Sequence, residues 1–159
     1  MDTVQFRFID ADLSETDKGI LIPKRHSELA SGFDLASAHK EDRVLKPQER
    51  LLIATGVALA IPGGFEGQVR SRSGLALKHG VVVLNSPGTI DADYRGELKV
   101  IVANLSQEDF VISFGMRIAQ LVIAPVCLPH LKEVSILGES LRGDGGFGST
   151  GMGEKTFPV

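Results

Sequence analysis

A guanidinium, a hydroxyl and a glycine follow one another at residues 72–74. Arg72 supplies a planar fork of N–H donors that matches phosphate oxygens, and Ser73 supplies a small hydroxyl donor. Gly74 permits close backbone approach, and the start of a short helix beyond it would favour an anion. Residues 67–90 contain no acid although the chain carries a net charge of −3, so the positive patch is local. The tripeptide predicts a phosphate site; a turn with solvated arginines is the alternative for three residues taken alone.

Two carboxylates lie in a turn-rich stretch, residues 85–96, between apolar segments. We interpret strand, turn and strand as a hairpin. Unpaired backbone groups at its tip would offer N–H, C=O and N–H, which complement the edge of uracil and not that of cytosine. On an extended strand Asp91 and Asp93 would share a face, with one activating water and the other structural. A pair of turn or capping acids is the alternative interpretation.

The C-terminal part of the chain is rich in glycine, with seven between residues 138 and 153. We therefore predict a domain at residues 1–137 and a flexible tail at residues 138–159. Phe147 has no local core to enter, so we expect it to stack on a partner outside the tail. Arg142, Ser149 and Thr150 would suit phosphate oxygens. A disordered linker is the alternative, and an adhesion tripeptide at residues 142–144 is a frequent chance match.

Short apolar or alternating segments bounded by turn residues dominate the chain and predict an all-β protein. Phe6 and Phe8 would share one face of a strand, as would Val100 and Val102. We expect two packed antiparallel sheets, a β-sandwich or jelly roll, with one short helix at residues 73–79 that ends at Gly80. The predicted strands are residues 4–9, 19–22, 50–61, 67–70, 81–84, 98–104, 110–112 and 118–126.

Composition narrows the function classes for this 159-residue chain. A pI near 5.8 argues against broad binding to nucleic acid or to an anionic membrane. The single Cys127 permits no internal disulfide, and the four histidines lack metal-pair spacing, so we predict no protein-built metal site. The N-terminus lacks a signal-peptide pattern, and the longest apolar runs have 11 residues, too few to span a bilayer. We expect a cytoplasmic protein.

Five segments in this order resemble the five motifs of the trimeric dUTP pyrophosphatase (dUTPase) family. The third is the acidic stretch described above, and the fifth is the glycine-rich tail. The first has Phe33 where the family often has Tyr, and the fourth has Met116 where an acid is common; neither position carries a catalytic role. The matching segments are residues 31–38, 70–76, 85–97, 115–121 and 142–151.

The resemblance implies a jelly-roll homotrimer whose active sites are shared between subunits and closed by a neighbour's tail. The reaction would be dUTP + H₂O → dUMP + pyrophosphate, with Mg²⁺ held by the substrate's phosphates and by water. Such an enzyme keeps uracil out of DNA and supplies dUMP for dTMP synthesis. Positioning and charge neutralisation provide most of the catalysis in phosphoryl chemistry, so no covalent nucleophile is needed.

The resemblance also implies roles for individual residues. Asp91 would activate the water that attacks the α-phosphate, and Tyr94 would pack under the deoxyribose and exclude a 2′-hydroxyl. Asp34 would contact residues that bind the substrate rather than bind the metal itself. Uracil would be recognised by Asn85 and by the segment 88–99, including Gly88, Thr89, Ile90 and Lys99; phosphates would contact Arg72, Ser73, Gly74, Gln120 and Arg142; Phe147 would stack on uracil, with Gly148 and Ser149 beside the substrate.

Two other functions remain open at the level of sequence. A dCTP deaminase has a similar subunit fold, but it would need a catalytic Glu and an Arg-Ser-Ser second motif, whereas residues 72–74 are Arg-Ser-Gly. A non-catalytic trimeric nucleotide-binding module is the other alternative. The presence of Asp91 and of the full tail favours an active dUTPase.

Overall fold

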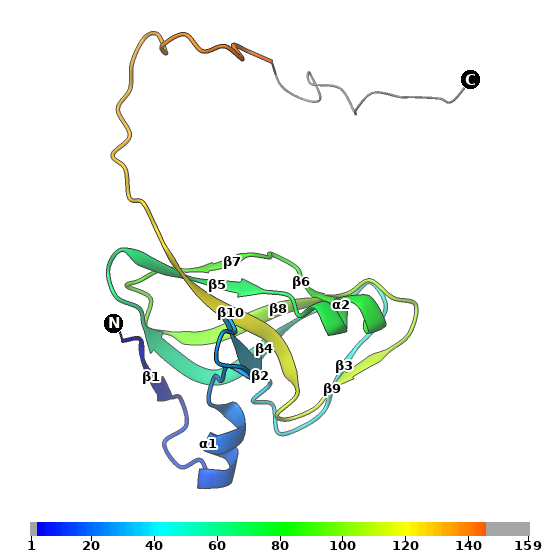
Figure 1. Ribbon diagram of the computed structural model, residues 1–159. Helices are drawn as coiled ribbons and strands as arrows, with labels where there is room; N and C mark the ends of the chain where they lie inside the picture. The colour runs from blue at the N-terminus through cyan, green and yellow to red at the C-terminus, as the bar shows by residue number, and fades with distance from the viewer. Residues whose placement is uncertain (1–2, 146–159) are drawn as a thin grey trace, which may run out of the picture. The chain divides into compact units, whose positions relative to one another are not determined.

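Strands form the framework of the first of two compact units in the computed structural model, which describes residues 3–145. The units are residues 1–128 and residues 129–159. In the first unit, two four-stranded antiparallel sheets and a two-stranded ribbon pack together (Figure 1). One sheet has the order β1(Gln5–Phe8), β4(Arg50–Ala60), β8(Glu97–Asn104), β6(Val81–Val83); the second has β2(Gly32–Ala36), β10(Arg117–Pro125), β5(Phe65–Arg70), β7(Gly88–Ile90); the ribbon pairs β3(Arg43–Leu45) with β9(Phe110–Ile112).

The core lies between the two sheets and follows the alternation of their strands. Val100 and Val102 of β8 are both buried, as their spacing predicts, and Val100 pairs with the buried Ile53 of β4. Phe6 and Phe8 also share a face, with their ring centroids 5.5 Å apart. Each large aliphatic side chain buried in this way contributes about 1.5–3 kcal/mol. The predicted sandwich of antiparallel sheets is therefore confirmed.

Two short helices accompany the strands. The predicted helix is present as α2(Ser73–His79), and Gly80 ends it with a φ of +65°, a left-handed conformation that glycine adopts without strain. The predicted strand at residues 19–22 is wrong, because residues 15–21 form α1(Glu15–Leu21). Ser14 caps this helix by accepting a hydrogen bond from the Asp17 N–H at 3.1 Å. The cap stabilises a helix that hydrophobic periodicity alone did not reveal.

The expected hairpin around residues 85–96 is confirmed in its arms, because β6 pairs antiparallel with β8, Val81 with Asn104 and Val83 with Val102. Its long connection was not predicted correctly, because residues 88–90 form β7, which pairs with β5 of the other sheet. Residues 91–96 therefore cross from one sheet of the sandwich to the other. The partners are chosen by packing between distant segments, which local turn signals do not encode. The sequence pattern likewise missed the short strands β2, β3 and β7.

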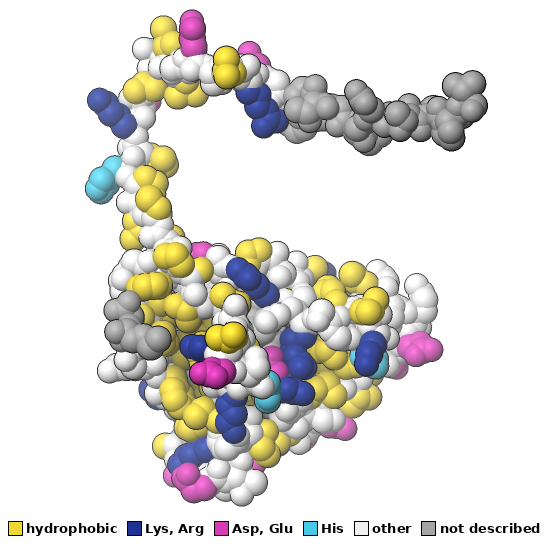
Figure 2. All heavy atoms as spheres, in the orientation of Figure 1, with side chains coloured by type: hydrophobic (Ala, Val, Ile, Leu, Met, Phe, Trp, Pro, Cys, Tyr) yellow, Lys and Arg dark blue, Asp and Glu magenta, His cyan; other side chains and the backbone are white. Residues whose placement is uncertain are grey.

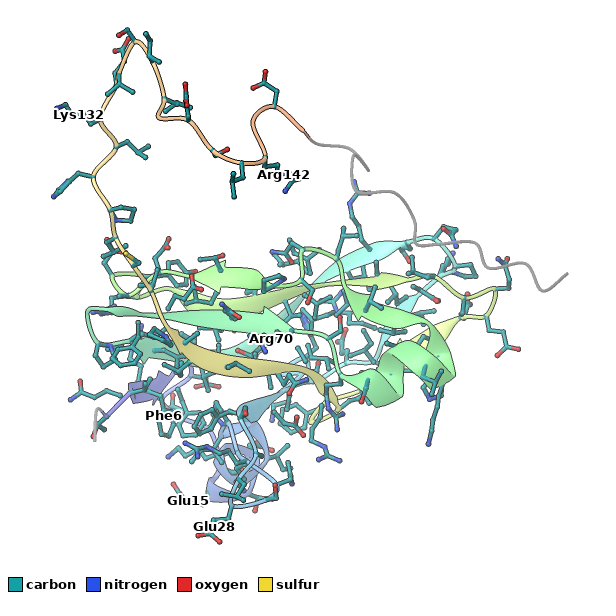
Figure 3. The ribbon with its side chains drawn as sticks, turned by 45° about the horizontal axis from the view of Figure 1, so that its top comes forward. Phe6, Glu15, Glu28, Arg70, Lys132 and Arg142 are labelled. Carbon is teal, nitrogen blue, oxygen red and sulfur yellow. The ribbon has the colours of Figure 1, made fainter. Side chains whose placement is uncertain are left out.

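The second unit, described as far as residue 145, contains no helix or strand in that part (Figure 3). A turn at residues 141–144 is closed by the Gly143 N–H, which donates to the Ser140 carbonyl at 3.2 Å. Arg142 Nε donates to the Gly145 carbonyl at 2.6 Å. Several aliphatic side chains are largely exposed, including Leu131, Ile136 and Leu137. The predicted division after residue 137 stays a prediction.

Candidate active site

Asp34 on β2 is the centre of a charged cluster. Its carboxylate contacts Arg72 Nε at 3.3 Å through Oδ1 and accepts from Arg117 Nη1 at 3.0 Å through Oδ2. His26 Nε2 lies 3.4 Å from Oδ2. Basic, acidic and histidine side chains gather on the face of the first unit seen in Figure 2. The Arg117 contact is a charge-assisted hydrogen bond, which is stronger than a neutral one, and the Arg72 contact is an ion pair, so one carboxylate orients two guanidinium groups.

The topology explains why these residues meet. Strand β2 pairs with the start of β10, where Arg117 lies, and β10 also pairs with β5, whose end leads into Arg72. Arg72 Nη1 donates to the carbonyl oxygen of Arg117 at 2.8 Å. The Arg117 carbonyl uses one of the five N–H donors of the Arg72 guanidinium, and Asp34 adds an ion pair at Nε. Arg72 is thus held in place by the protein before any ligand arrives.

Gln120 lies beside this cluster, in register with Asp34 on one side and with Arg70 on the other. Arg70 is labelled on β5 in Figure 3. The Gln120 amide donates from Nε2 to the Ser71 carbonyl at 3.0 Å. A side chain at Gly32 would collide with the Gln120 amide oxygen, so glycine there permits this position. Gln120 therefore contacts the backbone of Ser71, which precedes Ser73 by two positions in the predicted phosphate site.

Ser73 and Gly74 form the exposed first turn of α2. A Cβ atom added to Gly74 would meet no atom of the described chain within 4 Å. Packing within one copy therefore does not require glycine at this position. The open space is what the predicted close approach of a phosphate would use.

The loop of residues 91–96 carries the predicted catalytic carboxylate. Asp91 is exposed, and its carbonyl accepts the Tyr94 N–H at 3.1 Å. A turn at residues 92–93 follows, so the expected placement of Asp91 and Asp93 on one face of an extended strand is wrong. Arg95 Nη1 donates to the carbonyls of Ala92 at 2.6 Å and of Tyr94 at 2.9 Å. The loop is braced mainly by its own residues.

Tyr94 is folded back onto the strand that follows it. Its hydroxyl donates to the Glu97 carbonyl at 3.0 Å, and 45% of the residue remains exposed. A Cβ atom at Gly96 would collide with the tyrosine ring, so glycine makes this close approach feasible. Lys99, two residues beyond Glu97, is exposed.

Asn85 approaches the backbone at Gly88 closely. Gly88 is buried, and an added Cβ would lie 3.2 Å from Asn85 Nδ2 and 3.4 Å from Val69 Cβ. Thr89 is exposed and Ile90 is half-buried on the same short strand. The predicted uracil-recognition residues therefore lie along β7 and at its entry.

The phosphate-side residues and the Asp91 loop lie at opposite ends of β5. In the β5–β7 ladder Val69 pairs with Gly88 and Gly67 with Ile90. Continuing this register places Asp91 opposite residue 66, whereas Arg72 follows the other end of β5. Six residues of extended chain, about 20 Å, separate residue 66 from Arg72. One copy of the chain therefore does not bring Asp91 and Arg72 together.

Of the predicted tail residues, only Arg142 lies in the part of the chain that the structure describes. Arg142 lies in the second unit, where it braces the turn described above. Phe147, Gly148 and Ser149 lie outside the described residues.

The sequence interpretation did not identify three contributors to these two regions. Arg117 lies within the fourth motif, and its positive charge three positions before Gln120 could have indicated a phosphate-side residue. His26 and Glu97 gave no such signal, because their partners are distant in sequence or on the backbone. A β-sandwich that orients a guanidinium beside a short helix belongs to the class of proteins suited to bind phosphate groups.

Comparison with known proteins defines the family. A model of the dUTPase family matches residues 18–151. The deoxyuridine 5'-triphosphate nucleotidohydrolase of Rhizobium etli is 56% identical over 137 residues, covering 85% of this chain and 88% of that protein. The protein of the same name from Rickettsia felis is 55% identical over 131 residues, with coverage of 82% and 88%. The chain belongs to the dUTPase family, which confirms the resemblance.

Solved structures agree with this assignment. A variant of the Staphylococcus bacteriophage 80alpha dUTPase with dUpNHpp has a TM-score of 0.78 and 32% identity, covering 95% of this chain and 99% of that one. A variant dUTPase from phage phi11 of S. aureus, described with a structural Mg(II) ion, has a TM-score of 0.74 and 30% identity, with coverage of 87% and 100%. The expected jelly-roll fold is thereby confirmed.

Among residues 3–145 no helix is both long and apolar enough to cross a membrane.

Proposed function

We propose that this chain hydrolyses dUTP to dUMP and pyrophosphate in active sites that different copies of a homotrimer build together. The observation that carries the proposal is the separation of Asp91 from Arg72 along β5. Both groups must reach one triphosphate if Asp91 activates the attacking water and Arg72 binds phosphate oxygens. Because the β5–β7 register separates the two positions by about 20 Å of extended backbone within one copy, Asp91 of one copy would meet Arg72 of another.

Apolar surfaces support association of copies. On the outer face of the first sheet, Leu52 pairs with Ile101, and the Leu84 N–H donates to the Ile101 carbonyl. Leu52 and Leu84 are each more than half exposed. Adjoining aliphatic side chains of this kind mark an interaction surface. Neighbouring copies would cover them.

A second apolar surface lies between the edge strands β1 and β2. It is a groove of about 770 Å³ whose lining includes Val4, Phe6, Phe33 and Phe65. The second unit also exposes aliphatic side chains, including Leu131 and Ile136. These features favour an assembly in which several faces of each copy are covered.

The proposed reaction is a single displacement at the α-phosphorus. The Asp91 carboxylate accepts a proton from water while the water oxygen forms a bond to the α-phosphorus. The bond from that phosphorus to the bridging oxygen breaks, and pyrophosphate leaves with its electron pair. Arg72, with Ser73, Gly74 and Gln120, holds phosphate oxygens in line with the water.

The charge cluster around Asp34 is not suited to hold a metal ion itself. Two guanidinium groups already occupy the Asp34 carboxylate, which makes it a poor metal ligand. Residues 3–145 contain no group of three His, Cys, Asp or Glu side chains that could hold a metal ion. We propose that Mg²⁺ is bound by the triphosphate and water, where it would neutralise phosphate charge.

Base and sugar recognition is proposed for the other region. Asn85 and the backbone from Gly88 to Ile90 would bind uracil, with Lys99 nearby, and Tyr94 would fill the space of a 2′-hydroxyl. From a neighbouring tail, Arg142 would bind the γ-phosphate and Phe147 would stack on the base, beside Gly148 and Ser149.

The single, exposed Cys127 is consistent with the cytoplasm as the proposed location.

A pyrophosphate-release assay across dUTP, dCTP, dTTP and UTP with Mg²⁺ tests the activity. We expect release from dUTP to exceed release from the other three by orders of magnitude. Ammonia released from dCTP would instead identify a deaminase. Nucleotide binding with no product would identify a binding module.

Complementation tests the shared site directly. Asp91→Asn and Arg72→Ala should each be nearly inactive alone. After the two variants are refolded together, about a quarter of the sites in randomly mixed trimers would contain an intact Asp91 and an intact Arg72. Recovery of that share of wild-type activity supports sites built from two copies. No recovery in mixed trimers, verified by tagged subunits, would contradict it.

A further inference from the structure

A bulge in β4 supports the start of β8. Ala54 pairs with Lys99 and Ala58 pairs with Glu97, so the three residues 55–57 of β4 face the single residue Leu98 of β8. The extra residues interrupt the ladder and leave backbone groups to be satisfied in other ways. Gly56, at the centre of the bulge, has a φ of +72°.

The side chain of Glu97 takes the place of the missing ladder partner. Glu97 Oε1 accepts the Gly56 N–H at 3.0 Å, and 19% of the glutamate side chain is exposed. Its second oxygen, Oε2, lies 3.6 Å from Lys99 Nζ. One residue further, Thr55 Oγ1 donates to the Leu98 carbonyl at 2.7 Å. Two side chains therefore fasten the first residues of β8 to the bulge.

The bulge is itself held from the opposite side. The Gly56 carbonyl accepts the Ile9 N–H at 2.8 Å. A Cβ atom at Gly56 would lie 3.1 Å from the Ala38 Cβ and 3.2 Å from Leu21 Cδ1, so the backbone is closely packed there. Glu97 is thus anchored to a fixed part of the sandwich.

The main chain of the same residue holds Tyr94. The Glu97 carbonyl accepts the Tyr94 hydroxyl at 3.0 Å, as described above. The loop between Asp91 and Tyr94 is braced internally by Arg95, so it is expected to move as one body. A shift of Glu97 would therefore displace Tyr94 first and Asp91 with it.

We propose that Glu97 is a positioning residue that sets discrimination between deoxyribose and ribose by fixing the Tyr94 ring through the β4 bulge. The proposal rests on the proposed function, in which Tyr94 fills the space of a 2′-hydroxyl. Loss of the anchor lets the ring withdraw, so room opens for that hydroxyl. Displacement of about 1 Å also lowers turnover, because in-line geometry at the α-phosphorus is exacting.

The test compares three substitutions of Glu97 by their dUTP-to-UTP ratio of kcat/KM. Glu97→Ala removes the acceptor, and the ratio should fall about tenfold or more. Glu97→Asp keeps the charge but is one methylene too short to reach Gly56, so its ratio should also fall. Glu97→Gln keeps an oxygen that can accept the Gly56 N–H, and its ratio should stay within about twofold of wild type.

A core variant of the same strand controls for simple destabilisation. Ile53→Val lies in β4 before the bulge and should lower Tm without changing the ratio. Slower hydrogen exchange at the Gly56 amide in wild type and Glu97→Gln than in Glu97→Asp checks the anchor even if Glu97→Ala does not fold. Unchanged ratios in folded Glu97→Asp and Glu97→Ala would overturn the proposal. Failure of the wild-type chain to release pyrophosphate from dUTP would instead overturn the proposed function.

Discussion

The Asp34 cluster and the loop of residues 91–96 organise their side chains in different ways. Asp34 draws together Arg72 and Arg117 from segments far apart in the sequence through ion pairs. The loop is braced by hydrogen bonds among its own six residues and depends on the rest of the fold mainly at its base. The phosphate side is therefore organised by charge across strands, whereas the loop is organised by local backbone geometry and one anchor.

This difference implies a division of labour within the proposed site. Substitutions around Asp34 should act on binding of the phosphates, because they alter preorganised charge. Substitutions in the loop should act on turnover or on sugar selection, because they alter the position of reacting groups. The following experiments separate the two regions.

The largest effect is expected at Asp91. Asp91→Asn should lower kcat by about 10³-fold, because an amide does not accept the proton from water as a carboxylate does. Binding of a non-hydrolysable dUTP analogue, measured by calorimetry, should stay within a few fold of wild type. Near-normal turnover by this variant would remove Asp91 from its proposed role and end the assignment of chemistry to the loop.

Removal of the tail should come next. A chain that ends at residue 141 lacks Arg142 and Phe147, and its kcat/KM for dUTP should fall by about 10²-fold. The core precedes the cut, so circular dichroism and sedimentation should still report a folded trimer. Unfolding of the shortened chain would contradict the predicted separation between domain and tail.

Asp34 tests the charge-organised region. Asp34→Asn keeps the shape but removes the charge that orients Arg72 and Arg117, so KM for dUTP should rise about tenfold with a smaller change in kcat. Steady-state kinetics give both values. A strong fall in kcat with an unchanged KM would contradict the assignment of phosphate binding to the Asp34 cluster.

Gly32 tests the same region through packing. Gly32→Ala should push Gln120 from its place, and kcat/KM should fall roughly fivefold, the value of about one hydrogen bond. Gly63→Ala is the matched control, because an added Cβ there meets nothing within 4 Å. Equal kinetics for the two variants would show that Gln120 does not depend on the space at Gly32.

The smallest effect is expected at Asp17, outside both regions. The hydrogen bond from Lys40 Nζ, at 2.6 Å, lowers the pKa of the Asp17 carboxyl below its usual value. A lowered folded-state pKa stabilises the fold above the unfolded-state pKa and loses that contribution as pH falls through the lowered value. Asp17→Asn should lower Tm by about 1 °C at pH 7, and the difference should shrink below about pH 4. A thermal melt at both pH values checks this, with kinetics unchanged.

Local patterns in the sequence predicted a large part of the fold. The alternation at Val100 and Val102 marked a buried strand face, and Gly80 marked the end of α2, because both signals depend on neighbours in the chain. The helix at residues 15–21 was missed although Ser14 and Asp17 have the spacing of a helix cap. This helix has only 7 residues, too few for a helical period of apolar residues to be recognised in the sequence.

The site was less predictable than the strands that carry it. The motif order named Arg72, Asp91 and Gln120, but it did not indicate that Arg72 and Asp91 lie at opposite ends of β5. That separation depends on the register between β5 and β7, which distant packing decides. The anchoring of Gly56 by Glu97 was similarly hidden, because a backbone N–H freed by a bulge leaves no mark in the residue types.

The distance between the two ends of β5 has a genetic consequence under the proposed assembly. A copy defective at Arg72 would disable a site that uses the sound Asp91 of its neighbour, while its own Asp91 would still serve elsewhere. Two damaged alleles, one with a lesion at each end of this strand, would then restore part of the activity when one cell makes both, whereas two alleles with lesions at the same end would restore none.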